Sequence, residues 1–322
     1  MSLERTEQEQ KDILASVGID LSSEPEDLLL GKIVANRYKV LKKMGEGGMG
    51  TVYLAEHVTI EKRVALKVLL HEYARKADLK ERFLREAKAA ASIDHENIID
   101  ITDFGETPDK SVFFAMEYLD GQDLSHAIKN DGALPWARAK PILLQICRAL
   151  GAAHSKNIIH RDMKPENIFL IDRDGRPDFV KVLDFGIAKV SGASDGEHKL
   201  TRTGMIFGTP EYMSPEQAQG HIPDQRVDIY AVGVIMYELL TGRVPFRADT
   251  FMGILTKHIF EQPMPPTEAN PEAQIPVDAE AVTLMAMSKD RDDRFSSMSE
   301  MGAAIKAVSR RMTRSTSGHP AP

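Results

Sequence analysis

The spacing of hydrophobic and polar residues changes near residue 120. From Tyr38 to about Tyr118, short segments rich in β-branched and aromatic residues predict strands: YKVLKKMG, GTVYLAEH, RVALKVLL and SVFFAMEY. One helical stretch interrupts them, from about Leu79 to Ser92. From Gly121 onward, long helical patterns dominate. We therefore expect an α+β fold in which a small β-rich lobe precedes a larger helical lobe, with a cleft between them.

Three segments shape the expected larger lobe. PILLQICRALGAAHSKN has apolar residues at helical spacing, and DIYAVGVIMYELLTG is apolar nearly all round. The second pattern predicts a buried helix that ends at Gly242. Between the two, NIFLI and FVKVL flank a cluster of turn residues from Asp172 to Pro177, which predicts a β-hairpin.

Both ends of the chain are polar. Residues 1–36 are acidic and polar apart from Leu28-Leu29-Leu30, and predict a flexible extension with one short helix around Thr6 to Val17. The last residues, 310–322, predict a disordered tail. No internal repeat is visible. We therefore divide the chain into this extension, a small lobe at 37–119, a larger lobe at 120–309 and the tail.

Composition adds limits on location and partners. The 322 residues carry a net charge of −7 without a basic stripe, which argues against nucleic acid as a partner. The single cysteine, Cys147, excludes an internal disulfide; its apolar surroundings predict an inert buried thiol and fit the reducing cytoplasm. The polar start is no signal peptide, and the apolar run Ile229 to Leu240 is too short to span a bilayer. We expect a cytoplasmic protein, or the cytoplasmic part of a membrane receptor.

A glycine-rich segment lies between the first two expected strands, GEGGMGTV from Gly45 to Val52. Glycine lets the backbone approach phosphate oxygens and donate N–H hydrogen bonds without side-chain clash. The segment lacks the Gly-Lys-Ser/Thr of a Walker loop, and it opens no helix, which argues against a dinucleotide-binding turn. A plain hairpin turn remains the alternative.

Lys67 stands in the apolar strand segment VALK, where an unpaired ammonium would be costly to bury. Glu86, in the helix RFLREAKAAAS, is a suitable partner and would hold the lysine against nucleotide phosphates. Glu81 lies five residues earlier and falls on another helical face. The alternative is a strand lysine whose head reaches water.

The segment HRDMKPEN, from His160 to Asn167, is the most specific of the chain. It lies where a loop connects a helix to a strand. Phosphoryl transfer needs a carboxylate to orient the attacking hydroxyl and a ligand for the metal, and Asp162 and Asn167 supply both. Lys164 can neutralise charge on the moving phosphoryl group.

Asp184-Phe185-Gly186 follows the strand VKVL, and a carboxylate there suits Mg²⁺, with Mn²⁺ as an alternative ion. The same triplet occurs at Asp103-Phe104-Gly105. That copy precedes the HRD loop and stands where we expect a turn between strands. We assign no catalytic role to it.

In this order, the four segments match the signature set of protein kinases. The sequence resembles the eukaryotic-like (Hanks-type) serine/threonine protein kinases of bacteria, over about residues 38 to 308. The resemblance implies a bilobal fold, ATP and Mg²⁺ in the cleft, and protein substrates. It also implies Asp162 as catalytic base, with Lys164, Lys67 and Glu86 completing the catalytic set and Asn167 and Asp184 as metal ligands.

The resemblance extends to the nucleotide site. It implies an adenine pocket lined by strand residues, a gatekeeper at Met116 and a hinge at Glu117-Tyr118-Leu119; each of these is also an acceptable core residue. The expected nucleotide-binding set is Met44, Gly45, Glu46, Gly47, Gly48, Met49, Gly50, Val52, Ala65, Lys67, Met116, Glu117, Leu119 and Phe169.

Residues Ile187 to Met213 resemble an activation loop. Thr201 and Thr203 match the paired phosphothreonines of bacterial relatives, and Arg161 with Lys189 could receive their phosphates. We expect autophosphorylation at one or both; the alternative is a solvated pair of threonines. Thr209 is expected to bridge Asp162 and Lys164, which favours serine/threonine over tyrosine specificity.

The resembling family usually reads Ala-Pro-Glu where this chain has Ser214-Pro215-Glu216. Glu216 is expected to form a structural ion pair with Arg294, and Asp228 to hold the backbone of the catalytic loop. Such kinases often pair through their small lobes, so a homodimer is a further expectation.

Two other function classes fit the sequence less well. A pseudokinase would lack one of Lys67, Asp162, Asn167 or Asp184, and all four are present. A small-molecule kinase does not explain the long loop followed by GTPEYMSPE, which suits an extended polypeptide. We therefore predict an active serine/threonine protein kinase.

Overall fold

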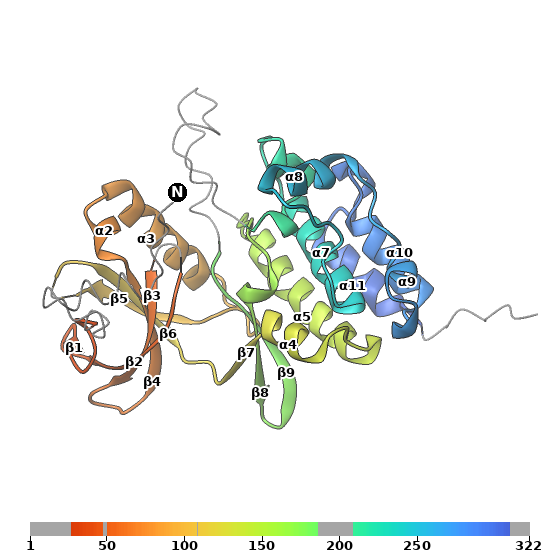
Figure 1. The fold of residues 1–322 in the computed structure, drawn as a ribbon. Coiled ribbons are helices and arrows are strands. Elements are labelled where there is room, and N and C mark those ends of the chain that lie inside the picture. The colour runs from red at the N-terminus through yellow and green to blue at the C-terminus, as the bar shows by residue number, and fades with distance from the viewer. Residues whose placement is uncertain (1–26, 48–49, 108, 186–208, 310–322) are drawn as a thin grey trace, which may run out of the picture.

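A computed structural model describes residues 27–47, 50–107, 109–185 and 209–309. Figure 1 shows a β-rich lobe next to a mainly helical lobe, as the sequence predicts. The two lobes follow each other along the chain, and the connection runs from strand β6 (Val112–Glu117) to strand β7 (Gly121–Asp123). Within the described residues, no helix combines the length and the apolar character needed to cross a membrane.

An antiparallel sheet of six strands forms the small lobe, in the order β1-β2-β3-β4-β6-β5. Its alternating side chains bury one face in a cluster around Tyr38, Leu66 and Phe113. The other strands are β1 (Ile33–Val34), β2 (Tyr38–Glu46), β3 (Gly50–His57), β4 (Arg63–Leu69) and β5 (Ile101–Glu106).

Helix α3 (Ala77–Ser92) accompanies this sheet (Figure 1), after the short helix α2 (His71–Ala74). The helix buries Phe83 and Ala87 against Leu69, Val112 and Phe114 of the sheet. This amphipathic packing fixes the side of α3 that carries Glu86, one residue before the buried Ala87. The predicted helix at 79–92 is therefore confirmed.

Two expectations for the small lobe are wrong. Asp103-Phe104-Gly105 does not form a turn but lies inside edge strand β5, where Asp103 accepts a hydrogen bond from the Tyr38 hydroxyl and forms an ion pair with Arg37. Residues 27–34, assigned to a flexible extension, are ordered on the sheet: β1 pairs with β2, and the Tyr53 hydroxyl donates to Asp27 at 2.8 Å. The apolar Leu29 packs against the small-lobe core, which a purely local pattern does not reveal. The helix expected around Thr6 to Val17 lies outside the described residues.

The larger lobe is built around helix α7 (Arg226–Thr241), which is buried along nearly its whole length. It ends at Gly242, whose φ of +75° is a left-handed conformation that suits glycine. The surrounding helices are α4 (Leu124–Asp131), α5 (Trp136–Ser155), α6 (Pro215–Ala218), α8 (Phe251–Phe260), α9 (Pro266–Ala269), α10 (Val277–Ala286) and α11 (Met298–Ala307), with short 3-10 turns at Pro165–Asn167, Pro210–Tyr212, Pro271–Ala273 and Arg291–Asp293.

The predicted hairpin is confirmed. Strands β8 (Ile168–Arg173) and β9 (Arg176–Val182) pair antiparallel, and β7 adds to β8. Backbone hydrogen bonds then tie β9 to the segment after α3: Ile99 donates to Val182, and Val182 donates to Asn97. The strand before Asp184 is thereby held next to the small lobe.

Candidate active site

Lys67 projects from β4 between two carboxylates. Its Nζ lies 3.1 Å from Glu86 Oε1 on α3 and 2.7 Å from Asp184 Oδ1, which follows β9. The predicted Lys67–Glu86 pair is thus present, and both side chains are only 12% exposed. Glu81 instead pairs with Arg85 on the exposed side of the helix, as its spacing predicts.

The two carboxylates stabilise the Lys67 ammonium that lies between them. Burial alone would lower the pKa of Lys67, but Asp184 and Glu86 outweigh burial and raise it well above its ordinary value. Asp184 is only partly buried; this partial burial opposes its ionisation, yet the Lys67 ammonium holds the pKa of that carboxyl below its usual range. For Glu86 burial dominates and its pKa is raised. The lysine is therefore a fixed cation at the junction of the two lobes.

The HRD loop places its polar residues around Asp162. Lys164 Nζ lies 3.8 Å from an Asp162 carboxylate oxygen and donates to the Thr209 hydroxyl at 3.3 Å. Asn167 donates its amide N–H to the Asp162 carbonyl at 2.8 Å. Lys164 therefore connects Asp162 with Thr209, the three residues that the sequence expected to lie together.

Asp228, at the start of α7, holds the backbone of this loop. Its carboxylate accepts the N–H groups of His160 and Arg161 at 2.9 and 2.8 Å, and its side chain is fully buried. His154 of α5 adds a third contact at 2.7 Å. The structural role predicted for Asp228 is confirmed, whereas sequence reasoning missed His154.

His160 and Phe185 connect the loop to the segment after β9. Their rings pack with centroids 4.8 Å apart, and the His160 Nε2–H donates to the Leu183 carbonyl at 2.7 Å. Burial lowers the pKa of His160, so the imidazole is neutral and donates through Nε2. Phe185 is itself fully buried in the larger core. These contacts fix Asp184 next to the loop that carries Asp162.

The expected adenine-pocket residues lie on adjoining strands. Val52 pairs with Lys67 in the sheet, and Ala65 pairs with Met116 on the next strand. Phe169 lies on β8 of the larger lobe. Ala65 is buried, and Val52, Met116, Leu119 and Phe169 are half-buried, so they retain surface that a nucleotide could cover.

Glu117, the first expected hinge residue, makes contacts that the sequence did not suggest. Its carboxylate accepts hydrogen bonds from Lys181 Nζ at 2.6 Å and from the Asp100 backbone N–H at 2.9 Å. Lys181 is a nearly buried lysine of β9 within FVKVL. Because a lysine in an apolar strand needs an anionic partner, the sequence indicates that Lys181 has one, as it does for Lys67, but not which carboxylate it is.

The described ends of the glycine-rich segment belong to β2 and β3, which pair with each other. Gly47 donates to the Gly50 carbonyl at 2.8 Å. A Cβ on Gly50 would lie 2.6 Å from the Val68 carbonyl oxygen, so close packing against β4 also requires glycine there. Met44 is exposed, Gly45 pairs with Val52, and Glu46 pairs with Lys43. Gly48 and Met49 lie outside the described residues, as do Thr201, Thr203 and Lys189.

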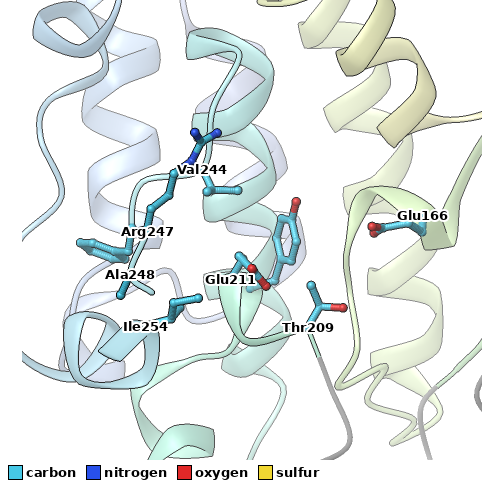
Figure 2. A pocket seen from close by; sticks show the side chains of 9 residues that line it. Glu166, Thr209, Glu211, Val244, Arg247, Ala248 and Ile254 are labelled. Carbon is cyan, nitrogen blue, oxygen red and sulfur yellow. The ribbon is translucent and has the colours of Figure 1, made fainter. Parts of the chain in front are cut away.

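A cavity of about 410 Å³ lies beside the catalytic loop (Figure 2). Figure 2 shows Glu166 and Thr209 on one side, Ile254 and Ala248 on the other, and Glu211 between them. The Tyr212 hydroxyl of this lining donates to Glu238 at 2.6 Å. Burial raises the pKa of Glu238, although this hydrogen bond opposes the shift, and the negative charges of Glu166 and Glu211 add to it. The full lining is Glu166, Thr209, Glu211, Tyr212, Val244, Phe246, Arg247, Ala248 and Ile254.

The structural ion pair predicted after the activation loop is present. The Arg294 guanidinium forms a bidentate ion pair with the Glu216 carboxylate, with N–O distances of 2.7 and 2.8 Å, and both side chains are buried. Cys147 is also buried, as predicted, and burial raises the pKa of its thiol to about 12. Neither feature takes part in the chemistry of the site.

Comparison with known proteins agrees with this arrangement. The family described as the protein kinase domain matches residues 38–304. The chain belongs to this family. Its relatives use ATP with a divalent metal ion, and the bilobal kinase fold expected from the sequence is confirmed.

Several bacterial kinases are similar to this kinase domain. It is 46% identical over 288 residues to serine/threonine-protein kinase pkn3 of Myxococcus xanthus, covering 89% of this chain and 53% of that protein. It is 39% identical over 281 residues to serine/threonine-protein kinase PrkC of Bacillus subtilis, covering 87% and 42%. The chain thus spans about half the length of these curated relatives.

A solved structure gives the same result. The crystal structure of the Mycobacterium tuberculosis PknI kinase domain aligns with a TM-score of 0.65 at 27% identity, covering 88% of this chain and 99% of that one. Together with the sequence relatives, it supports the predicted resemblance to bacterial Hanks-type serine/threonine kinases.

Proposed function

We propose that this chain is an active serine/threonine protein kinase that transfers the γ-phosphoryl group of ATP to protein hydroxyls. The observation that carries the proposal is Lys67, held between Glu86 and Asp184 while Asp162 lies on the adjoining loop. Catalysis of phosphoryl transfer is mostly positioning and charge stabilisation, and this arrangement supplies both.

Each residue has a role that follows from its contacts. Lys67, fixed as a cation, holds nucleotide phosphates, and Glu86 keeps its ammonium in place. The Asp162 carboxylate orients the attacking hydroxyl and accepts its proton. Lys164, close to Asp162, stabilises the charge that develops on the phosphoryl group.

Mg²⁺ fits the residues proposed to hold it. The Asn167 amide nitrogen donates to the Asp162 carbonyl, and its side-chain oxygen is then available as a metal ligand. Asp184 gives Oδ1 to Lys67 and retains Oδ2, on a side chain that is 43% exposed. Oxygen donors of this kind are what Mg²⁺ prefers. The bound ion would neutralise phosphate charge.

The cavity supports a polypeptide substrate. It adjoins Thr209, which Lys164 links to Asp162, so a chain lying across it would present a hydroxyl to the base. Glu166 and Glu211 give its near wall a negative charge, and a carboxylate oxygen of Glu211 is buried without a hydrogen-bond partner in the described structure. We propose that basic side chains near the acceptor residue favour a substrate here.

We further propose that the kinase phosphorylates its own activation loop at Thr201 or Thr203. Arg161 supports this role, because its Nε is buried and lacks a hydrogen-bond partner among the described residues. A phosphate brings nearly two negative charges and several acceptor oxygens to such a donor. Intact-mass and peptide measurements after incubation with ATP should find one or both threonines modified; neither being modified would exclude the proposal.

The proposed activity has a direct test with a matched control. The wild-type chain, given Mg²⁺-ATP and a generic basic protein, should transfer labelled phosphate, and Asp162→Asn and Asp184→Asn should reduce transfer at least about a hundredfold. Asp103→Asn changes the second Asp-Phe-Gly copy and should retain activity. A wild type no more active than Asp162→Asn would instead indicate a pseudokinase that only binds partners.

A further inference from the structure

Ser214 has a function in the structure that explains its departure from the usual alanine. It is the N-cap of α6: its hydroxyl oxygen accepts the N–H of Gln217 at 3.3 Å. In return, the Ser214 N–H donates to the side-chain oxygen of Gln217 at 3.1 Å. This reciprocal capping box, which alanine cannot form, fixes the side chain of Gln217 in one orientation.

The other half of the Gln217 amide reaches the catalytic loop. Its Nε2 donates to the carbonyl oxygen of Arg161 at 3.0 Å, although the two residues are 56 positions apart in the sequence. Arg161 directly precedes Asp162. One side chain therefore caps α6 through its oxygen and holds the backbone next to the proposed base through its nitrogen.

The backbone that Gln217 holds is strained. Arg161 has a φ of +65°, a left-handed conformation that non-glycine residues adopt only where their surroundings impose it. Its N–H is fixed by Asp228 at 2.8 Å and its carbonyl by Gln217. The next N–H, that of Asp162, points at His160 Nδ1 at 3.4 Å, and the Asp162 carbonyl accepts Asn167.

We propose that Gln217 is a positioning residue for Asp162, and that Ser214 orients it. Thr209, which borders the cavity and accepts a hydrogen bond from Lys164, lies just before α6 in the chain. The Ser214–Gln217 pair would therefore align the proposed substrate-binding segment with the backbone of the base. This inference rests on the proposed kinase activity.

The two functions of Gln217 can be separated by substitution. Gln217→Glu keeps an acceptor for the Ser214 N–H, and glutamate is favoured at this capping-box position, but it cannot donate to the Arg161 carbonyl. Gln217→Leu removes both functions without adding a charge. Gln219→Glu, at the exposed end of the same helix, adds the same charge as a control.

Steady-state kinetics and thermal unfolding should distinguish the variants. Both Gln217 variants should lower kcat about tenfold, with the KM for ATP nearly unchanged. In both, the carbonyl oxygen of Arg161 loses its hydrogen-bond donor. Only Gln217→Leu should also lower Tm. Amide hydrogen exchange at residues 160–164 should speed up in both variants and stay unchanged in Gln219→Glu.

If wild type is active and Gln217→Glu has an unchanged kcat, the positioning role is refuted. A loss of kcat confined to Gln217→Leu refutes it as well, because only the cap would then matter. An inactive wild type refutes the proposed kinase function, and this inference with it.

Ser214→Ala gives an independent check. Losing the hydroxyl should loosen the orientation of Gln217 and lower kcat a few-fold. When combined with Gln217→Glu, the effect should be smaller than the product of the two single effects, since both act through one contact. Full multiplicativity of the two effects would mean that Ser214 does not act through Gln217.

Discussion

His258 of α8 allows a quantitative prediction about acid stability. Its side chain is completely buried, its Nδ1 lies 2.8 Å from the Tyr230 hydroxyl, and the Phe246 ring packs with centroids 4.9 Å apart. Burial lowers the pKa of His258 to about 3, and the nearby Lys289 ammonium adds to this effect. The folded protein therefore holds this imidazole neutral.

The size of the effect follows from linkage. The ordinary pKa of histidine is 6.5, so between pH 6.5 and 3 the unfolded chain binds a proton at this residue that the folded chain does not. The contribution to stability is complete above pH 6.5 and is lost as the pH falls towards 3. From pH 7 to pH 5, His258 alone should reduce the free energy of unfolding by about 2 kcal/mol.

Urea unfolding at pH 7 and pH 5 tests this value. Wild type should lose about 2 kcal/mol more between the two pH values than His258→Gln, which has no titrating group there. His221→Gln, at an exposed histidine, should behave like wild type. Burial lowers the pKa of Lys289 to about 8, outside this pH window. An equal pH dependence in wild type and His258→Gln would refute the reasoning.

Three other predictions concern the site and its support. Lys67→Met should lower kcat/KM at least about a hundredfold; near-normal transfer would contradict its role. Glu216→Gln leaves the buried Arg294 without its counter-charge and should cost about 3 kcal/mol in urea unfolding, whereas a change within error would mean that the pair is dispensable. Combined Glu166→Gln and Glu211→Gln should reduce a preference for basic peptides about threefold to tenfold in a peptide-array assay, and an unchanged peptide profile would rule out the acidic wall as its source.

Much of the fold could be predicted from local patterns. The nearly all-apolar run of α7 and the hairpin β8–β9 were expected from sequence, because burial and turn chemistry are encoded locally. Strand β5 was missed, because this edge strand has only half-buried and exposed positions and can carry Asp103 and Gly105 without penalty. Its pairing with β6 is a tertiary contact. The packing of Leu29 on the small-lobe core is another.

In the candidate site, too, local patterns were predictable from sequence and tertiary contacts were not. Residues within one motif, such as Asp162 and Asn167, could be assigned because their spacing carries the chemistry. The partners of Lys181 and Gln217 could not, because Glu117 and Arg161 lie 64 and 56 positions away and no local pattern links them. Such long-range hydrogen bonds depend on the fold. These hydrogen bonds determine how the motifs are positioned, whereas the residues of each motif determine its chemistry.

The central claim is that this site moves a phosphoryl group from ATP to a protein hydroxyl through Asp162. Its most direct measurement is a single-turnover reaction with labelled ATP, in which ADP and phosphorylated serine or threonine are both quantified. We predict that wild type forms the two products in equal amounts, and that Asp162→Asn forms neither at a measurable rate while still binding ATP. Equal rates in the two proteins, or ATP binding without any transfer by wild type, would contradict the account.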